Sequence, residues 1–333
     1  MKIFLTGVTG FLGSHVAEAL CAEGHDVHAL ARDPASLHPD IAPLLGRPSG
    51  RLVLVRGSLF DAEALRAGCA NADAVVHVAG LIQARRESEY RKVNAQGTHT
   101  VLTAARESAP GLRRFVLISS QAAGGPAIDG VPRGPDEPAR PVSAYGRTKR
   151  EGEEIALARA GEVPVTILRP PVVFGARDRM LGRFFRAVAR GRIVVWGDGT
   201  NAFNVVHAPD VARAVVLALK TPHPSGSIFY TADDQRLTWR TFIDALAATT
   251  GSRVAVMRIP PFVFVIAAAL STAGAALTRG TPAFSFDKIA ELREKAWLCS
   301  ALRTREVLGW EPAGTLAQAL AVTHEWYRRA GQL

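Results

Sequence analysis

The first half of the chain alternates short apolar runs with amphipathic stretches. Apolar residues recur at helical spacing in four segments, residues 11–23, 61–69, 94–109 and 143–160. The apolar runs read KIFLTG, DVHALAR, RLVLVRG, DAVVHVAG, RFVLISS and PVTILRP. Continuous apolar strands separated by helices are what a parallel sheet requires when helices cover both of its faces. The pattern predicts an α/β fold with a doubly wound parallel sheet.

This alternation breaks after Arg169, where a smaller cap over the carboxyl edge of the sheet is expected. PPVVFGARDRM is loop-like, LGRFFRAVARG is helical, and NAFNVVHAPDVARAVVLALK suits a strand that leads into a helix. We expect residues 1–170 and 203–232 to form the sheet domain, and residues 171–202 and 233–333 to form the cap. The Gly- and Pro-rich span 124–141 is expected to be a loop above the functional site.

Composition and charge narrow the class of protein. With 333 residues and 48% hydrophobic content, the chain can bury a substantial core. The net charge of +10 attracts anions, but the arginines are spread along the chain without a basic block, so no nucleic-acid partner is expected. Three distant cysteines match no metal-ligand spacing, which predicts neither a metal site nor a disulfide framework. The N-terminal apolar run is too short for a signal peptide, so we expect a cytoplasmic protein.

A glycine motif follows the first predicted strand. The segment TGVTGFLG, from Thr6 to Gly13, opens the helix expected at residues 11–23. Gly7 permits a tight turn, Gly10 lets the backbone approach a pyrophosphate, and Gly13 permits close packing of helix and strand. The N-terminus of the helix would face the anion. In this setting the motif favours a dinucleotide-binding Rossmann fold over a purely structural glycine turn.

The residues at the end of the second predicted strand indicate whether the cofactor is NAD(H) or NADP(H). An acidic residue there would accept hydrogen bonds from the adenosine ribose, but Ala31 occupies the position and Arg32 follows it. A guanidinium can hold a 2′-phosphate, and no acid is present to repel one. NADP(H) is therefore favoured. NAD(H) stays open, because Arg32 beside Asp33 can also be a solvent-facing loop arginine.

The segment SAYGRTKREGEE places Tyr145 and Lys149 on one face of a predicted helix. A free tyrosine has a pKa near ~10, and a nearby ammonium favours the phenolate and lowers that pKa. Ser119 and Ser120 end the fifth strand, where a hydroxyl can bond a substrate oxygen. Such a Tyr-Lys pair also occurs on ordinary helix surfaces, but after the glycine motif and the serines it predicts acid–base chemistry beside a nicotinamide. The charged tail 150–154 is expected to be solvated.

Seven segments of the chain carry a resemblance to a known family. They are TGVTGFLG at 6–13, HVAG at 77–80, VNAQGT at 93–98, LISS at 117–120, YGRTK at 145–149, LRPPVVFG at 168–175 and NVVHAPDVA at 204–212. Together they resemble the short-chain dehydrogenase/reductase superfamily, in its extended branch of NAD(P)-dependent epimerases, dehydratases and reductases. The second half of the chain is similar to the 3β-hydroxysteroid dehydrogenase-like and dihydroflavonol reductase-like members.

The resemblance implies a role for each matching residue. Tyr145 would be the acid–base group, Lys149 would tune it and hold the nicotinamide ribose, and Ser120 would contact the substrate oxygen. Asn94 would complete the catalytic set by steadying the backbone behind the site. The implied cofactor contacts are Thr6, Gly7, Thr9, Gly10, Phe11, Leu12, Gly13, Arg32, Ser58, Leu59, Ala79, Gly80, Tyr145, Lys149, Pro170, Val172 and Val173. The family also implies a homodimer formed through the helices at 94–109 and 143–160.

Two positions depart from the family pattern. Many relatives have Gly-Asp after the third strand, where this chain has Gly57-Ser58, so Ser58 would replace the aspartate contact to adenine. Sugar-nucleotide members usually carry Arg-Asp four and three residues before His207, and this chain has Phe203-Asn204. A phenyl ring cannot neutralise a diphosphate, so a sugar nucleotide would lose a charge-assisted contact of about 1.5–3 kcal/mol. Phe203 is expected to contact an apolar substrate instead.

The cap contains one long apolar segment, IPPFVFVIAAALSTAGAALT at 259–278. A helix that spans a membrane needs about 20 such residues, so this run is marginal for that role. It can be a buried cap helix, the wall of a channel for a lipid-like substrate, or a monotopic helix that rests on a membrane through residues 260–278.

The sequence therefore predicts an NADP(H)-dependent oxidoreductase that interconverts a secondary alcohol and a ketone on a hydrophobic small molecule. By resemblance the substrate is sterol-, polyketide- or β-keto-lipid-like. One alternative is an NAD-dependent sugar-nucleotide epimerase or dehydratase. The other is a dinucleotide-binding sensor or scaffold without catalytic activity.

Overall fold

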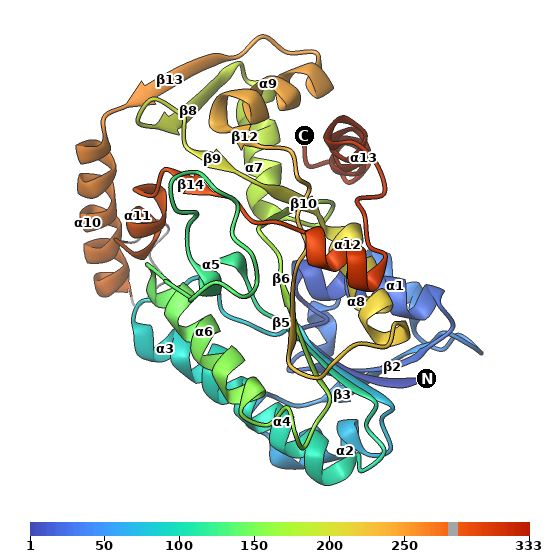
Figure 1. Ribbon diagram of the computed structural model, residues 1–333. Helices are drawn as coiled ribbons and strands as arrows, with labels where there is room; N and C mark the ends of the chain where they lie inside the picture. Colours follow the sequence, from blue (N-terminus) through green and yellow to red (C-terminus); the bar gives the residue numbers. More distant parts are fainter. Residues whose placement is uncertain (279–285) are drawn as a thin grey trace.

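The central sheet has seven parallel strands in the order β11-β6-β5-β4-β1-β2-β3 (Figure 1). The computed structural model describes residues 1–278 and 286–333. The strands are β1 (Lys2–Thr6), β2 (Asp26–Ala31), β3 (Leu52–Arg56), β4 (Ala74–His77), β5 (Arg114–Ile118), β6 (Val165–Arg169) and β11 (Ser227–Tyr230). The strand order reverses between β1 and β4, and ligands bind such sheets at the carboxyl ends of the strands beside that point. The predicted doubly wound Rossmann fold is confirmed, although β11 was not recognised as a strand.

Helices cover both faces of this sheet, as Figure 1 shows. The helices on one face are α1 (Phe11–Ala22) and α8 (Ala208–Lys220), and those on the other are α2 (Ala62–Cys69), α4 (Gly97–Ser108) and α6 (Ala144–Leu157). Val16 and Val215 belong to the first core, and Val101 and Ala156 to the second. Burial on both faces explains why the strands are almost continuously apolar.

Short elements connect these layers. They are η1 (Pro34–Ser36), η2 (Pro39–Leu44), α3 (Glu87–Arg91), the π-helical turn η3 (Lys92–Gln96) and α5 (Gln121–Gly124). The helix expected at 94–109 therefore begins inside a π-helical turn, which carries Asn94. Such turns are rare and often occur at functional sites.

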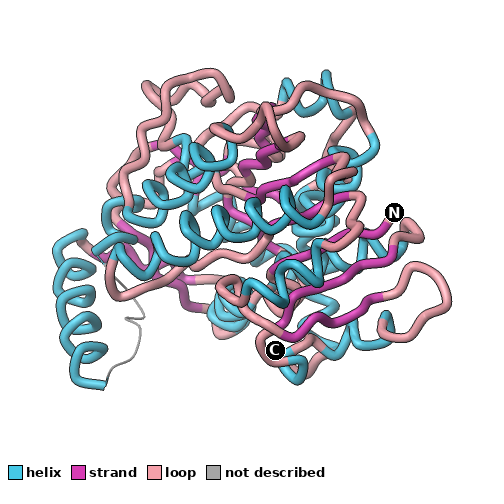
Figure 2. Tube along the Cα trace, turned by 90° about the horizontal axis from the view of Figure 1, so that it is seen from below, coloured by secondary structure: helices cyan, strands magenta, loops and turns pink. Residues whose placement is uncertain are grey.

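The cap consists of small sheets and surrounding helices. The elements outside the central sheet and its covering helices are β7 (Val172–Phe174), α7 (Arg179–Ala189), β8 (Arg192–Trp196), β9 (Ala202–Phe203), β10 (Val205–His207), β12 (Leu237–Thr238), α9 (Trp239–Thr250), β13 (Ala255–Ile259), α10 (Pro261–Thr278), α11 (Phe286–Leu292), β14 (Ala296–Trp297) and α13 (Leu316–Arg329). Phe185, Phe242 and Leu320 contribute to the separate hydrophobic core of the cap. Helix α10 stands at the outer edge of the molecule in both views (Figures 1 and 2). Within residues 1–278 and 286–333, none of the helices has the length and apolar character needed to cross a membrane.

The chain returns to the sheet domain after β14. Helix α12 (Leu302–Leu308) and Trp310 follow, and Ala301, Leu308 and Trp310 are buried in the same core as α1 and α8. The indole N–H of Trp310 donates to the carbonyl of Asp210 at 2.8 Å. The segment 301–310 was expected in the cap, but it packs on the sheet domain because it supplies apolar side chains to that core.

The Gly- and Pro-rich span 124–141 is held by a buried arginine. The Arg133 guanidinium is 1% exposed and donates to the carbonyls of Pro126 and Pro138 within the loop. The backbone N–H of Arg133 donates to the carbonyl of Leu298, beside β14. This loop is therefore tied to the segment that follows the cap.

Candidate active site

The glycine motif forms a closed turn between β1 and α1. Gly7 has φ +86, and a Cβ there would lie 2.7 Å from the backbone nitrogen of Ala79. A Cβ on Gly13 would lie 1.9 Å from the carbonyl oxygen of Gly7, and the N–H of Gly10 donates to the same oxygen at 3.0 Å. Only glycine satisfies these approaches, so the turn keeps a backbone cradle at the helix N-terminus. That cradle fits the pyrophosphate of a dinucleotide.

Thr6 joins the ends of β1 and β4. Its hydroxyl is 2.6 Å from Nδ1 of His77 and accepts the N–H of Ala79 at 3.3 Å. Burial lowers the pKa of His77 to about 3, and the Lys149 charge acts in the same direction, so the imidazole is neutral. The segment Ala79-Gly80, expected under the cofactor, is thereby fixed beside the glycine turn.

Asn94 steadies the backbone that follows. Its Oδ1 accepts the N–H of Leu81 at 2.8 Å, and its amide nitrogen donates to the carbonyl of Leu81 at 3.1 Å. The amide also donates to Thr148 Oγ1 at 3.2 Å, in α6. Asn94 therefore links the loop after β4 to the helix that carries Tyr145. A role for Asn94 at the reacting atoms stays a prediction.

The ends of β2 and β3 supply the residues expected near the adenosine. Ala31 is buried, whereas Arg32 is exposed. The Asp33 carboxylate accepts the N–H of Ala35 at 3.1 Å and the hydroxyl of Ser36 at 2.8 Å, so local bonds occupy it. Ser58 Oγ accepts the N–H of Phe60 at 3.2 Å, and the neighbouring Leu59 is partly buried.

Ser120 and Tyr145 meet at the carboxyl end of β5. Ser120 is the N-cap of α5, its hydroxyl accepts the N–H of Ala122 at 3.2 Å, and its side chain lies close enough to that of Tyr145 to lower the pKa of the phenol. The Ser119 hydroxyl is buried and has no partner among the residues that the structure describes. Ser120, which the family resemblance favours over Ser119, is thus the serine whose side chain influences Tyr145.

Lys149 lies one helical turn after Tyr145 and is buried. Its ammonium donates to the carbonyl of Ile118 at 2.6 Å, and a Cβ on Gly80 would lie 3.7 Å from Nζ. Burial lowers the pKa of Lys149 to about 8, against the opposing charge of Glu153. The lysine therefore faces the loop on which the cofactor is expected, and it is largely protonated at neutral pH.

The pKa of Tyr145 moves in the direction opposite to the prediction. Burial raises it to about 12, and the hydrogen bond from Ser120 offsets only part of that rise. The Lys149 ammonium was expected to lower this pKa, but its described hydrogen bond goes to the Ile118 carbonyl. Desolvation of the phenolate outweighs the other influences here.

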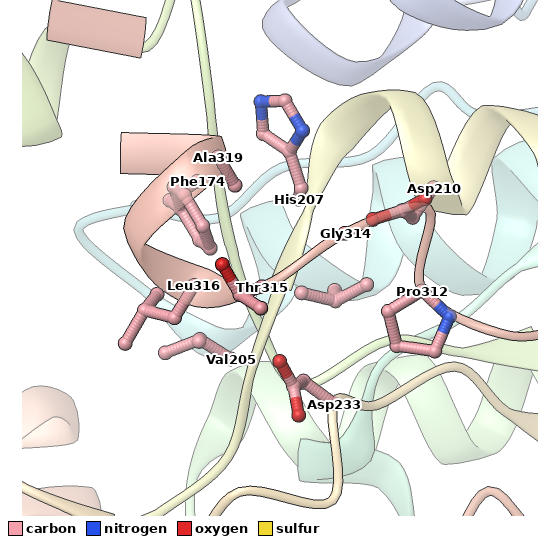
Figure 3. A pocket seen from close by; sticks show the side chains of 11 residues that line it. Phe174, Val205, His207, Asp210, Asp233, Pro312, Gly314, Thr315, Leu316 and Ala319 are labelled. Atoms are coloured by element: carbon pink, nitrogen blue, oxygen red, sulfur yellow. The ribbon is translucent and has the colours of Figure 1, made fainter. Parts of the chain in front are cut away.

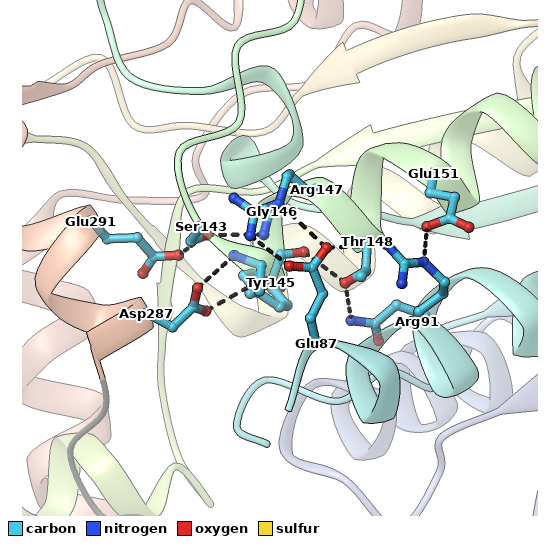
Figure 4. Close-up of polar contacts among 12 residues, drawn as sticks. Glu87, Arg91, Ser143, Tyr145, Gly146, Arg147, Thr148, Glu151, Asp287 and Glu291 are labelled. Carbon is cyan, nitrogen blue, oxygen red and sulfur yellow. Dashed lines mark hydrogen bonds and ion pairs between the residues drawn. The ribbon is translucent and has the colours of Figure 1, made fainter. Parts of the chain in front are cut away.

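The N-terminus of α6 is held by carboxylates from the cap (Figure 4). Ser143 caps the helix by accepting the N–H of Gly146 at 3.0 Å, and its hydroxyl donates to Glu291 Oε1 at 2.8 Å. Asp287 accepts the backbone N–H groups of Ala144 and Tyr145. Sequence reasoning missed Asp287 and Glu291, because nothing in the local sequence of α11 indicates where it docks.

The other end of α6 is anchored by a buried ion pair. Arg169 donates to both carboxylate oxygens of Glu153 at 2.8 and 2.6 Å, and to the Tyr230 hydroxyl at 3.1 Å. Glu153 is fully buried, which corrects the expectation that the tail 150–154 is solvated throughout. This bidentate pair fixes α6 to β6.

The remaining predicted contacts lie around β7 and β9. The carbonyl of Pro170 accepts the N–H of Gln121 at 2.9 Å, Val172 is exposed, and Val173 is half-buried. Phe203 is buried in the cap core, with its ring centroid 4.9 Å from that of Trp239. Its substrate contact stays a prediction.

Figure 3 shows a small pocket where α13 approaches β10. Its lining includes Phe174, His207, Asp210, Asp233 and Leu316. Ser120, Tyr145 and Lys149 are not among the described residues that line it, so this pocket is separate from the group of side chains at the end of β5.

Comparison with known proteins gives one family and several relatives. A model of the NAD dependent epimerase/dehydratase family matches residues 3–230. The ceramide reductase of Caulobacter vibrioides is 30% identical over 99% of this chain and 96% of its own length. The 4-hydroxy-2-methyl-3-oxo-4-farnesyl-3,4-dihydroquinoline-1-oxide ketoreductase of Stigmatella aurantiaca is 31% identical over 78% of this chain and 76% of its own. Among solved structures, MoeE5 in complex with UDP-glucuronic acid and NAD is 26% identical, with a TM-score of 0.77 over 99% of this chain and 100% of that one.

Proposed function

Because the chain belongs to the NAD dependent epimerase/dehydratase family of extended short-chain dehydrogenases/reductases, we propose that it interconverts a secondary alcohol and a ketone on a hydrophobic small molecule with NADP(H). The observation that carries this reaction is the proximity of the Ser120 and Tyr145 side chains at the end of β5, with the buried Lys149 ammonium one helical turn further along α6. The three groups supply an oxygen contact, a proton donor and a cation at one end of the sheet.

Each group has a distinct task in the reducing direction. A bound nicotinamide would supply the hydride that the carbonyl carbon receives. The Ser120 hydroxyl holds the carbonyl oxygen, and Tyr145 gives its phenolic proton to that oxygen as negative charge develops there. A pKa of about 12 keeps Tyr145 protonated at neutral pH, which suits a proton donor. The Lys149 ammonium faces Gly80, where it would hold the nicotinamide ribose, and its attraction for the phenolate left behind is weaker than the desolvation that raises the pKa of Tyr145.

The proposed substrate class rests on Phe203. In sugar-nucleotide relatives an arginine is usual at this position, whereas Phe203 packs against Trp239 and Phe242. An aromatic cluster favours an apolar substrate over a diphosphate. The names of the Caulobacter and Stigmatella relatives support a carbonyl on a lipid-like molecule.

The preference for NADP(H) rests on Arg32. The side chain is exposed directly after β2, and Asp33 is engaged by Ala35 and Ser36. A 2′-phosphate at the end of β2 would therefore contact the Arg32 guanidinium, whereas the Asp33 carboxylate is already occupied by local hydrogen bonds. NAD(H) is the alternative, since MoeE5 is described with NAD.

Turnover of NADPH tests the proposal. The purified protein should oxidise NADPH in the presence of a long-chain β-keto acyl compound or a 3-ketosteroid. Tyr145→Phe should bind NADPH normally, as measured by nucleotide fluorescence, yet turn over at least ~100-fold more slowly. Tyr90→Phe is the matched control, because the Tyr90 ring packs 6.2 Å from that of Tyr145 and should retain activity. Undiminished turnover by Tyr145→Phe would disprove the proton-donor role.

A sugar-nucleotide epimerase or dehydratase is the second candidate. It is favoured by the similarity to MoeE5 along the whole chain. Thermal-shift titration with UDP-glucuronic acid and dTDP-glucose separates the two functions, because only a true ligand stabilises the fold by mass action. Conversion of either sugar without net loss of NADPH would replace the ketoreductase proposal.

A further inference from the structure

Helix α10 stands at the edge of the cap (Figures 1 and 2), and several of its apolar side chains are exposed. Phe262, Ile266 and Leu270 follow one another at a spacing of four residues and are 63%, 53% and 69% exposed. Residues four apart lie on one side of a helix, so they form a continuous stripe. On the opposite side, Val265 and Ala268 pack with Ile289 of α11. The helix is therefore apolar on its covered side and on its exposed side.

This exposed stripe is unlike a solvated helix surface. A surface helix normally turns a charged or polar face to water, and α10 contains no Asp, Glu, Lys or Arg from Pro261 to Thr278. Exposed apolar patches of this kind mark sites of interaction with protein or membrane. The charged residues around the stripe indicate which partner, a protein or a membrane, fits this surface.

The sequence that leads into α10 is basic without compensating acids. No Asp or Glu occurs from Ala245 to Thr278, and Arg253 and Arg258 are exposed in this range. Between Asp178 and Asp198 there is likewise no acidic residue. That interval contains Arg179, Arg183, Arg186, Arg190 and Arg192. The segments 179–197 and 245–278 lie side by side because β13 pairs with β8.

The β8–β13 ribbon combines both properties on one face. In its parallel register Met257 lies beside Val194 and Ala255 beside Arg192. Val194 and Met257 are 45% and 50% exposed, and Arg192 is exposed as well. The acidic neighbour is Asp198, which accepts hydrogen bonds from Thr200 and lies near Arg258. Among the described residues the ribbon thus carries more arginines than carboxylates, and the carboxylates of α11, Asp287 and Glu291, are bonded to the N-terminal turn of α6.

We propose that α10 and the β8–β13 ribbon dock the protein onto the surface of an anionic lipid bilayer. Helix α10 lies in the plane of the interface, with Phe262, Ile266 and Leu270 among the acyl chains, and the arginines of the ribbon meet the phosphate headgroups. Apolar insertion together with basic contacts gives the two contributions that stable interfacial binding requires. This inference does not depend on which reaction the protein performs.

The docking surface is joined to the catalytic helix. Helix α11 packs against α10 and also holds the N-terminus of α6 through Asp287 and Glu291. Arg85, in the loop before α3, donates to the carbonyl of Ala275 in α10 at 3.0 Å. The short helix α11 therefore connects the proposed membrane-binding helix α10 to the turn of α6 that carries Tyr145.

Vesicle co-sedimentation tests the proposal with the full chain. The unmodified protein should sediment with vesicles of equimolar phosphatidylcholine and phosphatidylglycerol, and much less with phosphatidylcholine alone. Leu270→Glu should weaken this binding by about tenfold or more, because it sets a charge into the apolar stripe. Val322→Glu is the matched control: Val322 is 65% exposed on α13, away from α10, and this variant should bind as the unmodified protein does. Arg192→Gln should weaken binding to the anionic vesicles by about fivefold, because Arg192 lies on the same face of the ribbon as Val194 and Met257.

The same samples reveal the outcomes that would overturn the proposal. Equal sedimentation of Leu270→Glu and Val322→Glu would show that the stripe does not contact lipid. A second copy of the chain is the competing occupant, so the mass in solution is measured without vesicles. A dimer of the unmodified protein that Leu270→Glu converts to a monomer, without any vesicle binding, would assign the stripe to self-association.

Discussion

Asp287 and Tyr145 are 142 residues apart in the chain, and the carboxylate of Asp287 accepts the backbone N–H of Tyr145 at 3.2 Å. The same carboxylate also accepts the N–H of Ala144. A negative charge at a helix N-terminus stabilises the helix through unpaired N–H groups and the helix dipole. The cap thus acts directly on the backbone that positions the proposed proton donor.

We expect Asp287→Asn to misplace Tyr145 without unfolding the protein. Loss of the charge should lower the free energy of unfolding by about 0.5–1 kcal/mol. It should also lower kcat several-fold while the KM for NADPH is unchanged. Urea unfolding and steady-state kinetics measure the two effects. Asp244→Asn, an exposed carboxylate that pairs with Arg240 in α9, serves as control and should change neither quantity.

Removing the charge of Glu153 should lower the free energy of unfolding far more than removing the charge of the neighbouring Glu154. Glu153→Gln leaves the buried Arg169 guanidinium without its counter-ion, which should lower the free energy of unfolding by about 3–5 kcal/mol. Glu154→Gln, at a site 58% exposed, should change it by less than about 0.5 kcal/mol. Urea denaturation of the two variants compares them directly. Similar losses would mean that the buried pair does not stabilise α6.

The pH profile of ketone reduction should fall above about pH 8, where Lys149 loses its proton. Tyr145, with a pKa of about 12, stays protonated over this range and does not set the limit. Unfolding does not explain the fall, because the native pKa of Lys149 lies below its ordinary 10.5. The unfolded chain therefore binds more protons between pH 8 and 10.5, and the contribution of this group to stability rises with pH. Measurement of kcat/KM against pH checks this, and a flat profile to pH 10 would contradict it.

The glycine turn gives a test of steric fit separate from backbone strain. Gly7 and Gly46 both have positive φ, +86 and +72, but a Cβ meets the Ala79 backbone only at Gly7. Gly7→Ala should therefore lose NADPH binding and destabilise the fold, whereas Gly46→Ala should cost about 1 kcal/mol from strain alone. Nucleotide fluorescence and thermal unfolding report the two quantities. Normal NADPH affinity in Gly7→Ala would contradict the proposal that this turn binds the pyrophosphate of the cofactor.

Arg32→Ala should raise the Kd for NADPH by about tenfold or more, since a charge-assisted bond to phosphate is worth about 1.5–3 kcal/mol. The Kd for NADH, which lacks the 2′-phosphate, should stay the same. Arg240→Ala, with a comparably exposed side chain in the cap, should bind both as before. Isothermal titration with the two nucleotides decides this, and an equal loss for both would remove the basis for NADP(H) selectivity.

Most of the sheet domain follows from local sequence, because buried parallel strands and their helices have distinctive apolar patterns. The six predicted strands and the glycine turn are examples. The choice of Ser120 over Ser119 comes from the family resemblance, and its contact with a substrate oxygen stays a prediction. The strand β11 was missed because SIFY is short and mixed in polarity.

Contacts between distant segments could not be predicted in the same way. The burial of Glu153 depends on Arg169, and the pKa of Tyr145 depends on how tightly the site is enclosed. Asp287 belongs to a short helix whose docking place is set by tertiary packing. In each case the local sequence is that of an ordinary charged surface, and the packed fold determines the environment.

Because residues 301–310 pack on the sheet domain, they limit how the chain can be truncated or its cap exchanged. The segment 3–230 that defines the family does not include Ala301, Leu308 or Trp310, although all three belong to its core. A chain truncated after β11 would leave that core open to water. For the same reason, a relative's cap cannot be exchanged as a cassette unless the graft keeps the native stretch from Ala301 to Trp310.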